Sequence, residues 1–479
     1  MTGGPVRKLG LGGLSAMVFS MMVGSGIFNI PQNIASSSGL AASMVAWGIT
    51  AAAMLSLVYT FRQLSLKCPE LNAGIYEYAR AGFGRYAGFL MAWGYWLCVC
   101  FANVAYAVML NDAFGSFFPS LLHHDWKMVL FGLAFIWGMY FLVSGGLKTA
   151  RQLNNIMTVL KIVPILLIII LLSIWFRLPV AGESWPGFAG FGDLTTQVRD
   201  TMLVTLWCFI GIEGAVMMSA RARKPRDVSR AGVIGFGTAW ILYALVSVLS
   251  FGILDRMQLS NLEDPSVAYL LRECCGPWAY WTVIVTVILS VAGSWVSWTM
   301  VCAQVPMEAA NTGIFPKRFK KLNSHDMPAF GLRVSSVAMS VFLIIVAMSD
   351  DVYMAALQIT GMMVLPCYLF SALYLIKLGI ANAHGLRKSL PVAIICSISC
   401  VWMLYSAGPT LMATSVFYLA GTGFYITAGK EKNRYYGIVL SRASSWKHYF
   451  TAGELTVCIL LALLSAASVA AYATGLIKL

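Results

Sequence analysis

Two glycine-containing interruptions are the places in this chain where backbone groups could bind a ligand. Gly24-Ser25-Gly26 breaks the first long apolar stretch, and Gly211 and Gly214 flank Glu213 in a later one. Hydrocarbon offers no water to freed backbone groups, so irregular backbone at that depth must be buried in protein or line a wet cavity. The two interruptions therefore predict a binding site for a polar ligand.

Two ionisable residues, Glu213 and Lys161, lie within apolar stretches. A charge at mid-membrane depth costs about 3 to more than about 10 kcal/mol and is functional by default. Desolvation favours a protonated Glu213 in some states; the alternative is a neutral carboxyl satisfied by hydrogen bonds of its own helix. Lys161 lies roughly 13 Å deep at 1.5 Å per residue, so it either snorkels to the interface or acts as a fixed buried charge.

The elements that must position these residues are membrane-spanning helices. Of the 479 residues, 59% are hydrophobic and 11% are charged, a composition that excludes an ordinary soluble domain. A span needs about 20 apolar residues, and about thirteen stretches qualify. They lie near residues 11–38, 40–62, 86–118, 127–146, 152–176, 200–220, 231–254, 278–306, 332–349, 351–377, 390–406, 409–429 and 452–475.

The formal net charge of +14 reflects basic residues that gather in alternate loops. Arg221, Arg223, Lys224, Arg226 and Arg230 form one such cluster, whereas the loops in between hold few basic residues. This asymmetry is typical of cytoplasmic basic loops. The positive charge therefore indicates how the chain is oriented in the membrane and does not indicate a nucleic-acid partner. It predicts a cytoplasmic N-terminus and, with an odd number of spans, an external C-terminus.

The two interrupted stretches lie five spans apart. Glycine-interrupted segments in corresponding positions of two halves indicate an inverted-repeat transporter with its site between them. We therefore expect a single domain over residues 1–479, with a first repeat at 11–176, a second at 200–377 and peripheral helices at 390–475. Short helices are also expected within 70–84 and 265–273.

Two sequence runs carry a family resemblance, Met22-Val-Gly-Ser-Gly-Ile-Phe-Asn-Ile-Pro-Gln-Asn33 and Trp207-Cys-Phe-Ile-Gly-Ile-Glu213. They resemble the amino acid, polyamine and organocation transporter superfamily, and most of all the basic amino acid and polyamine antiporters of the bacterial arginine-ornithine branch. The similarity extends over nearly the whole chain. It implies an all-α LeuT-like fold with a 5+5 inverted repeat, broken helices 1 and 6, and two or three peripheral helices; members usually have twelve spans, one fewer than expected here.

Backbone at the two breaks is expected to hold both ends of an amino acid's polar head. N–H groups at Gly24, Ser25, Gly26 and Ile27 lie at the positive end of a half-helix dipole, which suits a carboxylate, although such glycines can also serve close helix packing. Carbonyls between Trp207 and Ile210 suit an α-amino group. Trp207 could cover the site as a gate, or be an interfacial residue.

The resemblance assigns the cationic end of the ligand to Asn103 and Trp298, and Thr360 is expected to face the same cavity. An aromatic face attracts a cation by about 0.5–2 kcal/mol. Taken alone, a tryptophan such as Trp298 is more often a packing residue, and an asparagine such as Asn103 more often makes an interhelical hydrogen bond.

The resemblance further implies a gate in which Tyr95 and Tyr368 act with Glu213, which also senses protons. Cys367 stands where the family has a tyrosine directly after a proline, which is a departure from its pattern. Some relatives carry a lysine like Lys161 in place of a second sodium ion. The sequence shows no acidic cage for sodium, so sodium coupling is not expected.

These inferences combine into a secondary-active antiporter of cationic amino acids in a bacterial cytoplasmic (inner) membrane, most readily arginine for ornithine. Arginine-agmatine exchange and proton-coupled uptake are the alternatives. The absence of HExxH, GxSxG and GxxxxGK[ST] motifs disfavours an enzyme, and no cofactor or bound metal is expected. The partners are the small-molecule substrates and the lipid bilayer, and the resemblance allows a homodimer.

Overall fold

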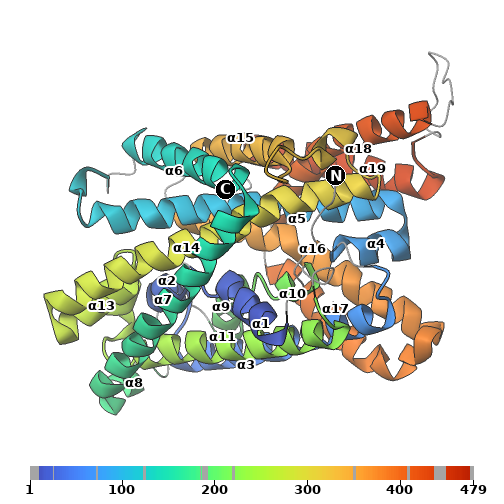
Figure 1. Ribbon diagram of the computed structural model, residues 1–479. Helices are drawn as coiled ribbons and strands as arrows, with labels where there is room; N and C mark the ends of the chain where they lie inside the picture. Colours follow the sequence, from blue (N-terminus) through green and yellow to red (C-terminus); the bar gives the residue numbers. More distant parts are fainter. Residues whose placement is uncertain are drawn as a thin grey trace.

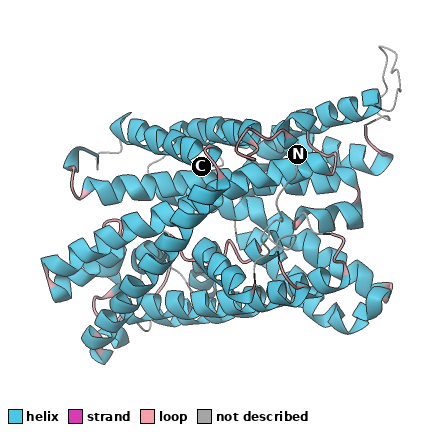
Figure 2. Cartoon of the chain, in the orientation of Figure 1, coloured by secondary structure: helices cyan, strands magenta, loops and turns pink. Residues whose placement is uncertain are grey.

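The computed structural model describes residues 10–24, 26–71, 74–121, 126–183, 185, 193–217, 222–348, 352–406, 410–435 and 449–474. Within these ranges the chain folds into helices joined by loops, and no strand is present (Figure 2). This agrees with the all-α architecture expected from the length and spacing of the apolar stretches.

The helices up to residue 183 are α1 (Leu11–Met22), α2 (Gly26–Ser37), α3 (Leu40–Lys67), α4 (Tyr76–Phe83), α5 (Arg85–Gly115), α6 (Trp126–Ser144), α7 (Leu147–Trp175) and α8 (Leu178–Glu183). The next are α9 (Leu194–Trp207), α10 (Gly214–Met217), α11 (Pro225–Ser250), α12 (Arg256–Ser260), α13 (Ser266–Cys275) and α14 (Pro277–Asn311). The last are α15 (Ala329–Val346), α16 (Val352–Ile380), α17 (Leu390–Ser406), α18 (Thr410–Tyr435) and α19 (Ala452–Ala473). The short α4 and α13 confirm the helices expected within 70–84 and 265–273.

Ten helices of the described part are long and apolar enough to cross a membrane, and the bent pair α1 and α2 makes an eleventh span. The two remaining predicted spans correspond to α7, whose apolar portion covers Leu160–Trp175, and to the interrupted pair α9 and α10. Every predicted stretch therefore coincides with a helix or a broken helix. The protein is a multi-pass membrane protein.

Burial separates a central bundle from its periphery. The most apolar window of α5 is 94% buried and that of α14 is 78% buried, whereas that of α19 is only 11% buried. The long helices cross Figure 1 from side to side, with α5, α14 and α16 packed together and α19 packed on α18. Since lipid is as apolar as a leucine side chain, an exposed apolar α19 fits the peripheral position expected for 390–475.

The two ends of the bundle differ in their short helices. In Figure 1, α4 lies at the right-hand end, while α8 and α13 lie at the left-hand end. We call the first the α4 end and the second the α13 end.

At the α13 end, Asp193 caps α9 by accepting hydrogen bonds from the Thr196 hydroxyl (2.6 Å) and backbone N–H (3.1 Å). These bonds favour the carboxylate and hold the pKa of Asp193 below its usual range.

Candidate functional site: a closed cavity between two broken helices

The first break separates α1 from α2, whose axes differ by 44°. Val23 ends α1 and Gly26 begins α2, while Ser25 lies outside the described residues. The first N–H groups of any helix have no partner within it, so the start of α2 offers donors at the break. This is the arrangement expected for the Gly24–Gly26 segment.

The second break lies against the first. After Trp207 ends α9, a turn over residues 208–213 leads into α10. Gly211 has φ +112°, and a Cβ there would lie 3.0 Å from the carbonyl carbon of Met21. A Cβ on Gly214 would lie 2.6 Å from the Met21 sulfur. At Gly211, where the backbone of Met21 is met and φ is positive, only glycine fits; at Gly214 a side chain would require the Met21 side chain to shift.

Carbonyl groups between Trp207 and Ile210 were expected to bind an α-amino group, but only some of them are free of other hydrogen bonds. The carbonyl of Trp207 already accepts the N–H of Ile210 (3.2 Å), and that of Phe209 accepts the N–H of Ile212 (3.1 Å). Among the described residues, no donor reaches the carbonyls of Cys208 and Ile210. The same holds for the carbonyl of Ile212, so these three groups of the turn are available to an amino group.

A cavity with about 260 Å³ of space between its walls lies where the breaks meet. Its lining residues are Met21, Met22, Gly24, Gly26, Ala102, Tyr106, Trp207, Ile210, Tyr243 and Trp298. All of them are buried, so the cavity is closed toward both ends of the bundle. Inside it, the room left for a water molecule is only about 10 Å³, which is about enough for one water. The cavity must therefore widen before it can hold an amino acid.

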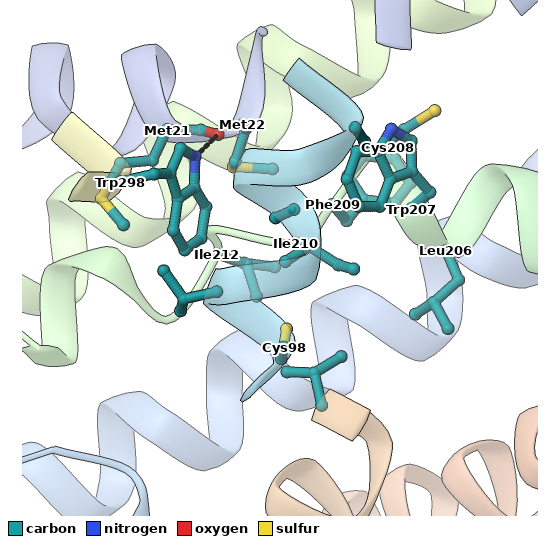
Figure 3. Packing of buried hydrophobic residues seen from close by; sticks show 14 of the residues in the cluster. Met21, Met22, Cys98, Leu206, Trp207, Cys208, Phe209, Ile210, Ile212 and Trp298 are labelled. Atoms are coloured by element: carbon teal, nitrogen blue, oxygen red, sulfur yellow. Dashed lines mark hydrogen bonds between the residues drawn. The ribbon is translucent and has the colours of Figure 1, made fainter. Parts of the chain in front are cut away.

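Aromatic rings form the walls of this cavity. Trp298 and Trp207 lie on opposite sides of Ile210 (Figure 3). The indole N–H of Trp298 donates to the Met21 carbonyl (3.1 Å) and fixes the orientation of the ring. A Cβ on Gly26 would lie 3.0 Å from Nε1 of Trp207, so a side chain at this position would push the ring away.

Glu213 is fully buried and is held by three donors. The hydroxyl of Tyr95 donates to Oε1 (2.8 Å), that of Tyr368 to Oε2 (2.7 Å), and the backbone N–H of Gly211 also to Oε2 (3.1 Å). The cluster joins α5 and α16 to the turn that follows α9. The structure thus brings together the three side chains expected to form a gate, despite the departure at Cys367.

Lys161 is 1% exposed, which contradicts the snorkelling interpretation. Its ammonium group donates to the carbonyls of Val23 (2.8 Å) and Ser20 (3.1 Å) and to the hydroxyls of Ser20 and Ser294 (both 3.1 Å). It therefore satisfies carbonyls freed where α1 ends. A cation there also complements the negative end of the α1 dipole.

Several predicted site residues do not line the closed cavity. Asn103 is buried and donates from Nδ2 to the Cys302 sulfur (3.2 Å), while its Oδ1 has no partner among the described residues. The hydroxyl of Thr360 donates to the carbonyl of Ala356 in its own helix (2.7 Å). Ile27 is buried but is not a lining residue. Their contact with a ligand stays a prediction for another conformation.

Sequence reasoning missed two tyrosines that do line the cavity. Tyr106 lies four residues after Ala102, so both share the inward face of α5. A Cβ on Gly24 would lie 2.7 Å from the Tyr106 hydroxyl, which explains the glycine there. Tyr243 of α11 donates to the Met22 carbonyl (3.0 Å). The four-residue spacing could have revealed Tyr106, whereas nothing local identifies Tyr243.

A bundle of membrane-spanning helices with a closed cavity between two broken helices defines a secondary transporter. The chain belongs to the amino acid permease family, whose sequence profile matches residues 9–429. This confirms the superfamily resemblance, and the family is one of transporters.

Curated relatives match over nearly their whole length. An arginine/agmatine antiporter of Chlamydia pneumoniae is 38% identical, covering 99% of this chain and 98% of its own. One from Chlamydia abortus has the same identity and coverage. A protein of Clostridium perfringens named as an amino-acid transporter is 37% identical, covering 91% of this chain and 96% of its own.

Among solved structures, a Na⁺-coupled sialic acid symporter in a substrate-bound outward-open state is similar in fold. The TM-score is 0.53 at 13% sequence identity, over 84% of this chain and 90% of that chain. At this identity the likeness concerns the fold alone. It agrees with the LeuT-like fold that the family resemblance implies.

Proposed function

We propose that this protein is an antiporter that exchanges arginine for a second cationic ligand by alternating access. The observation that carries the proposal is the cavity itself, which has helix N–H groups on one side and the Trp298 ring in its wall. A carboxylate favours the start of α2, and a guanidinium favours an indole face. Ile210 lines the cavity, and its free carbonyl supplies an acceptor for the α-amino group.

Agmatine is the second ligand that the names of the Chlamydia relatives support, and ornithine is compatible with the same site. Agmatine has no carboxylate and would bind through its cationic end alone. Ornithine would also use the start of α2. The two pairs thus differ in whether the outgoing ligand needs the Gly24–Gly26 segment.

Exchange is tested by measuring the uptake of labelled arginine into proteoliposomes that contain agmatine, ornithine, lysine or no amine. Uptake is expected to be several-fold faster into vesicles loaded with the true partner than into empty ones. Equal uptake into empty vesicles would contradict antiport. Repeating the measurement with an imposed pH gradient tests proton-coupled uptake as the alternative.

Replacing Trp298 by alanine is expected to raise the KM for arginine by about 2- to 30-fold, because about 0.5–2 kcal/mol of cation-π attraction is lost. Trp298→Phe keeps an aromatic face and is expected to change the KM less, although it loses the bond to Met21. The matched control is Trp295→Ala on the same helix, since Trp295 is buried against Phe135 (ring centroids 6.1 Å apart) and does not line the cavity. Equal KM changes in Trp298→Ala and Trp295→Ala would assign Trp298 a packing role.

The location proposed for this antiporter is a bacterial cytoplasmic membrane, with the N-terminus and the α4 end in the cytoplasm. The basic loops support this orientation, and it puts Trp207 on the outer side of the cavity and Glu213 on the inner side. The external C-terminus, the repeat boundaries at 11–176 and 200–377, and a homodimer stay predictions. Accessibility of single engineered cysteines in the loops of intact cells tests the orientation.

A further inference from the structure

Three arginines line a groove outside the cavity, between the ends of α3 and α11. Arg62 lies on α3, and Arg226 and Arg230 lie on α11, around about 1160 Å³ of open space. The two helices pack side by side along the lower edge of the molecule in Figure 1. The groove lies toward the α4 end, because α3 ends and α11 begins there.

The spacing on α11 builds one continuous face of this groove. Arg226, Ser229, Arg230, Val233 and Ile234 recur at helical intervals and all line it. Asp227, the acidic residue of the first turn of α11, is not among the lining residues. The face therefore changes from guanidinium groups to apolar side chains within about two turns.

The arginines of the groove are exposed, and none has an ion-pair partner among the described residues. Guanidinium groups bind phosphate oxygens through paired hydrogen bonds. The groove therefore selects an anion with several oxygens. A free phosphate would use only the arginines and leave the rest of the groove unexplained.

The apolar part of the groove favours a lipid over a soluble anion. Val233 and Ile234 are 45% and 47% exposed, and the apolar surface continues along α11 through Ile241 and Leu245, which are 50% and 40% exposed. Such a surface borders acyl chains in a membrane. Basic pockets between helices at the cytoplasmic face bind phospholipid headgroups.

We propose that this groove binds an anionic phospholipid, with its phosphate on Arg62, Arg226 and Arg230 and an acyl chain along Val233 and Ile234. Arg62 and Ser229 also line a second, inner space between helices whose wall includes Ile212, Ala215 and Val216. These residues flank Glu213 in the second broken helix. The bound headgroup thus stabilises the arrangement of α3 and α11 around the segment that carries the gate.

Binding is tested on the full-length protein by native mass spectrometry, counting retained phosphatidylglycerol against zwitterionic phosphatidylcholine. The triple variant Arg62→Gln, Arg226→Gln, Arg230→Gln is expected to bind phosphatidylglycerol about tenfold more weakly or worse. The matched control Arg318→Gln, Lys320→Gln, Lys321→Gln removes the same charge from exposed residues of another loop. If both variants lose phosphatidylglycerol binding equally, or if the groove variant loses none, the proposal is overturned.

Inorganic phosphate and glycerol 3-phosphate distinguish the source of the anion. We expect neither to displace phosphatidylglycerol at millimolar concentration, and displacement would instead identify a soluble-anion site. In a second measurement, which rests on the proposed exchange, wild-type protein should exchange several-fold faster in vesicles with phosphatidylglycerol than in phosphatidylcholine alone. The groove variant should lack this acceleration. A failed exchange assay leaves the binding result intact, so the two proposals fail separately.

Discussion

Replacing Lys161 by methionine is expected to reduce exchange about 100-fold or more and to lower the melting temperature of the purified protein. Methionine is apolar and of similar length, but it donates to none of the four oxygens that the ammonium contacts at 2.8–3.1 Å. Each buried acceptor left without a donor costs about 1–3 kcal/mol. The Ser20 carbonyl keeps the Ser294 hydroxyl as a donor (3.1 Å), so the Val23 carbonyl at the end of α1 is the backbone acceptor that loses its donor. A cost of about 2.7 kcal/mol corresponds to 100-fold.

The measurements for Lys161→Met are arginine exchange in proteoliposomes and thermal unfolding in detergent. Lys377→Met is the matched control, because Lys377 also donates to a backbone carbonyl, that of Gly82 (2.6 Å), but lies away from both breaks. It is expected to lower stability while leaving exchange closer to normal. Exchange at the wild-type rate in Lys161→Met would show that the ammonium has no part in holding the first break.

Replacing Glu213 by alanine is expected to reduce exchange at least about tenfold and to flatten its dependence on pH. The hydroxyls of Tyr95 and Tyr368 and the N–H of Gly211 all lose their acceptor in a buried place, at about 1–3 kcal/mol each. A water molecule that enters the space left by the side chain would replace some of these hydrogen bonds, and this limits the reduction in exchange.

The pH dependence follows from the neighbours of Glu213. Its titratable neighbours are Tyr95, Tyr368, Cys98 and Cys367, and phenols and thiols of these types carry no charge near neutral pH. Glu213 is thus the group of this cluster that can gain or lose a proton in the working range. Exchange measured between about pH 5 and pH 8 is expected to vary in the wild type and to stay level in the variant.

Two further variants separate the role of the proton from that of the structure. Glu213→Gln keeps the shape and one carbonyl acceptor, so we expect measurable exchange without pH dependence. Glu308→Ala removes a half-buried carboxyl from the α4 end of α14 and should leave the pH profile unchanged. A wild-type pH profile in Glu213→Ala would show that another group binds the proton.

The local sequence was sufficient to predict the helices and the positions of the two breaks. Apolar runs of span length have few alternatives to a helix in hydrocarbon, and each predicted run coincides with a helix or a broken helix. Gly24, Gly26, Gly211 and Gly214 marked both breaks because glycine is unfavourable inside a helix, so paired glycines within an apolar stretch indicate irregular backbone. These are properties of short segments, which a sequence displays directly.

Tertiary structure decided which side chains meet at the breaks. Lys161 reaches the end of α1 across a separation of 141 residues from Ser20, and no local pattern distinguishes that arrangement from snorkelling. Tyr243 contacts the Met22 carbonyl across 221 residues, and Arg62 comes beside Arg226 and Arg230 only because α3 packs on α11. Asn103 and Thr360 were assigned to the cavity, yet they make other hydrogen bonds in its closed form. The periodicity of a helix fixes the face on which a residue lies, but the packing of helices distant in sequence fixes what that face meets.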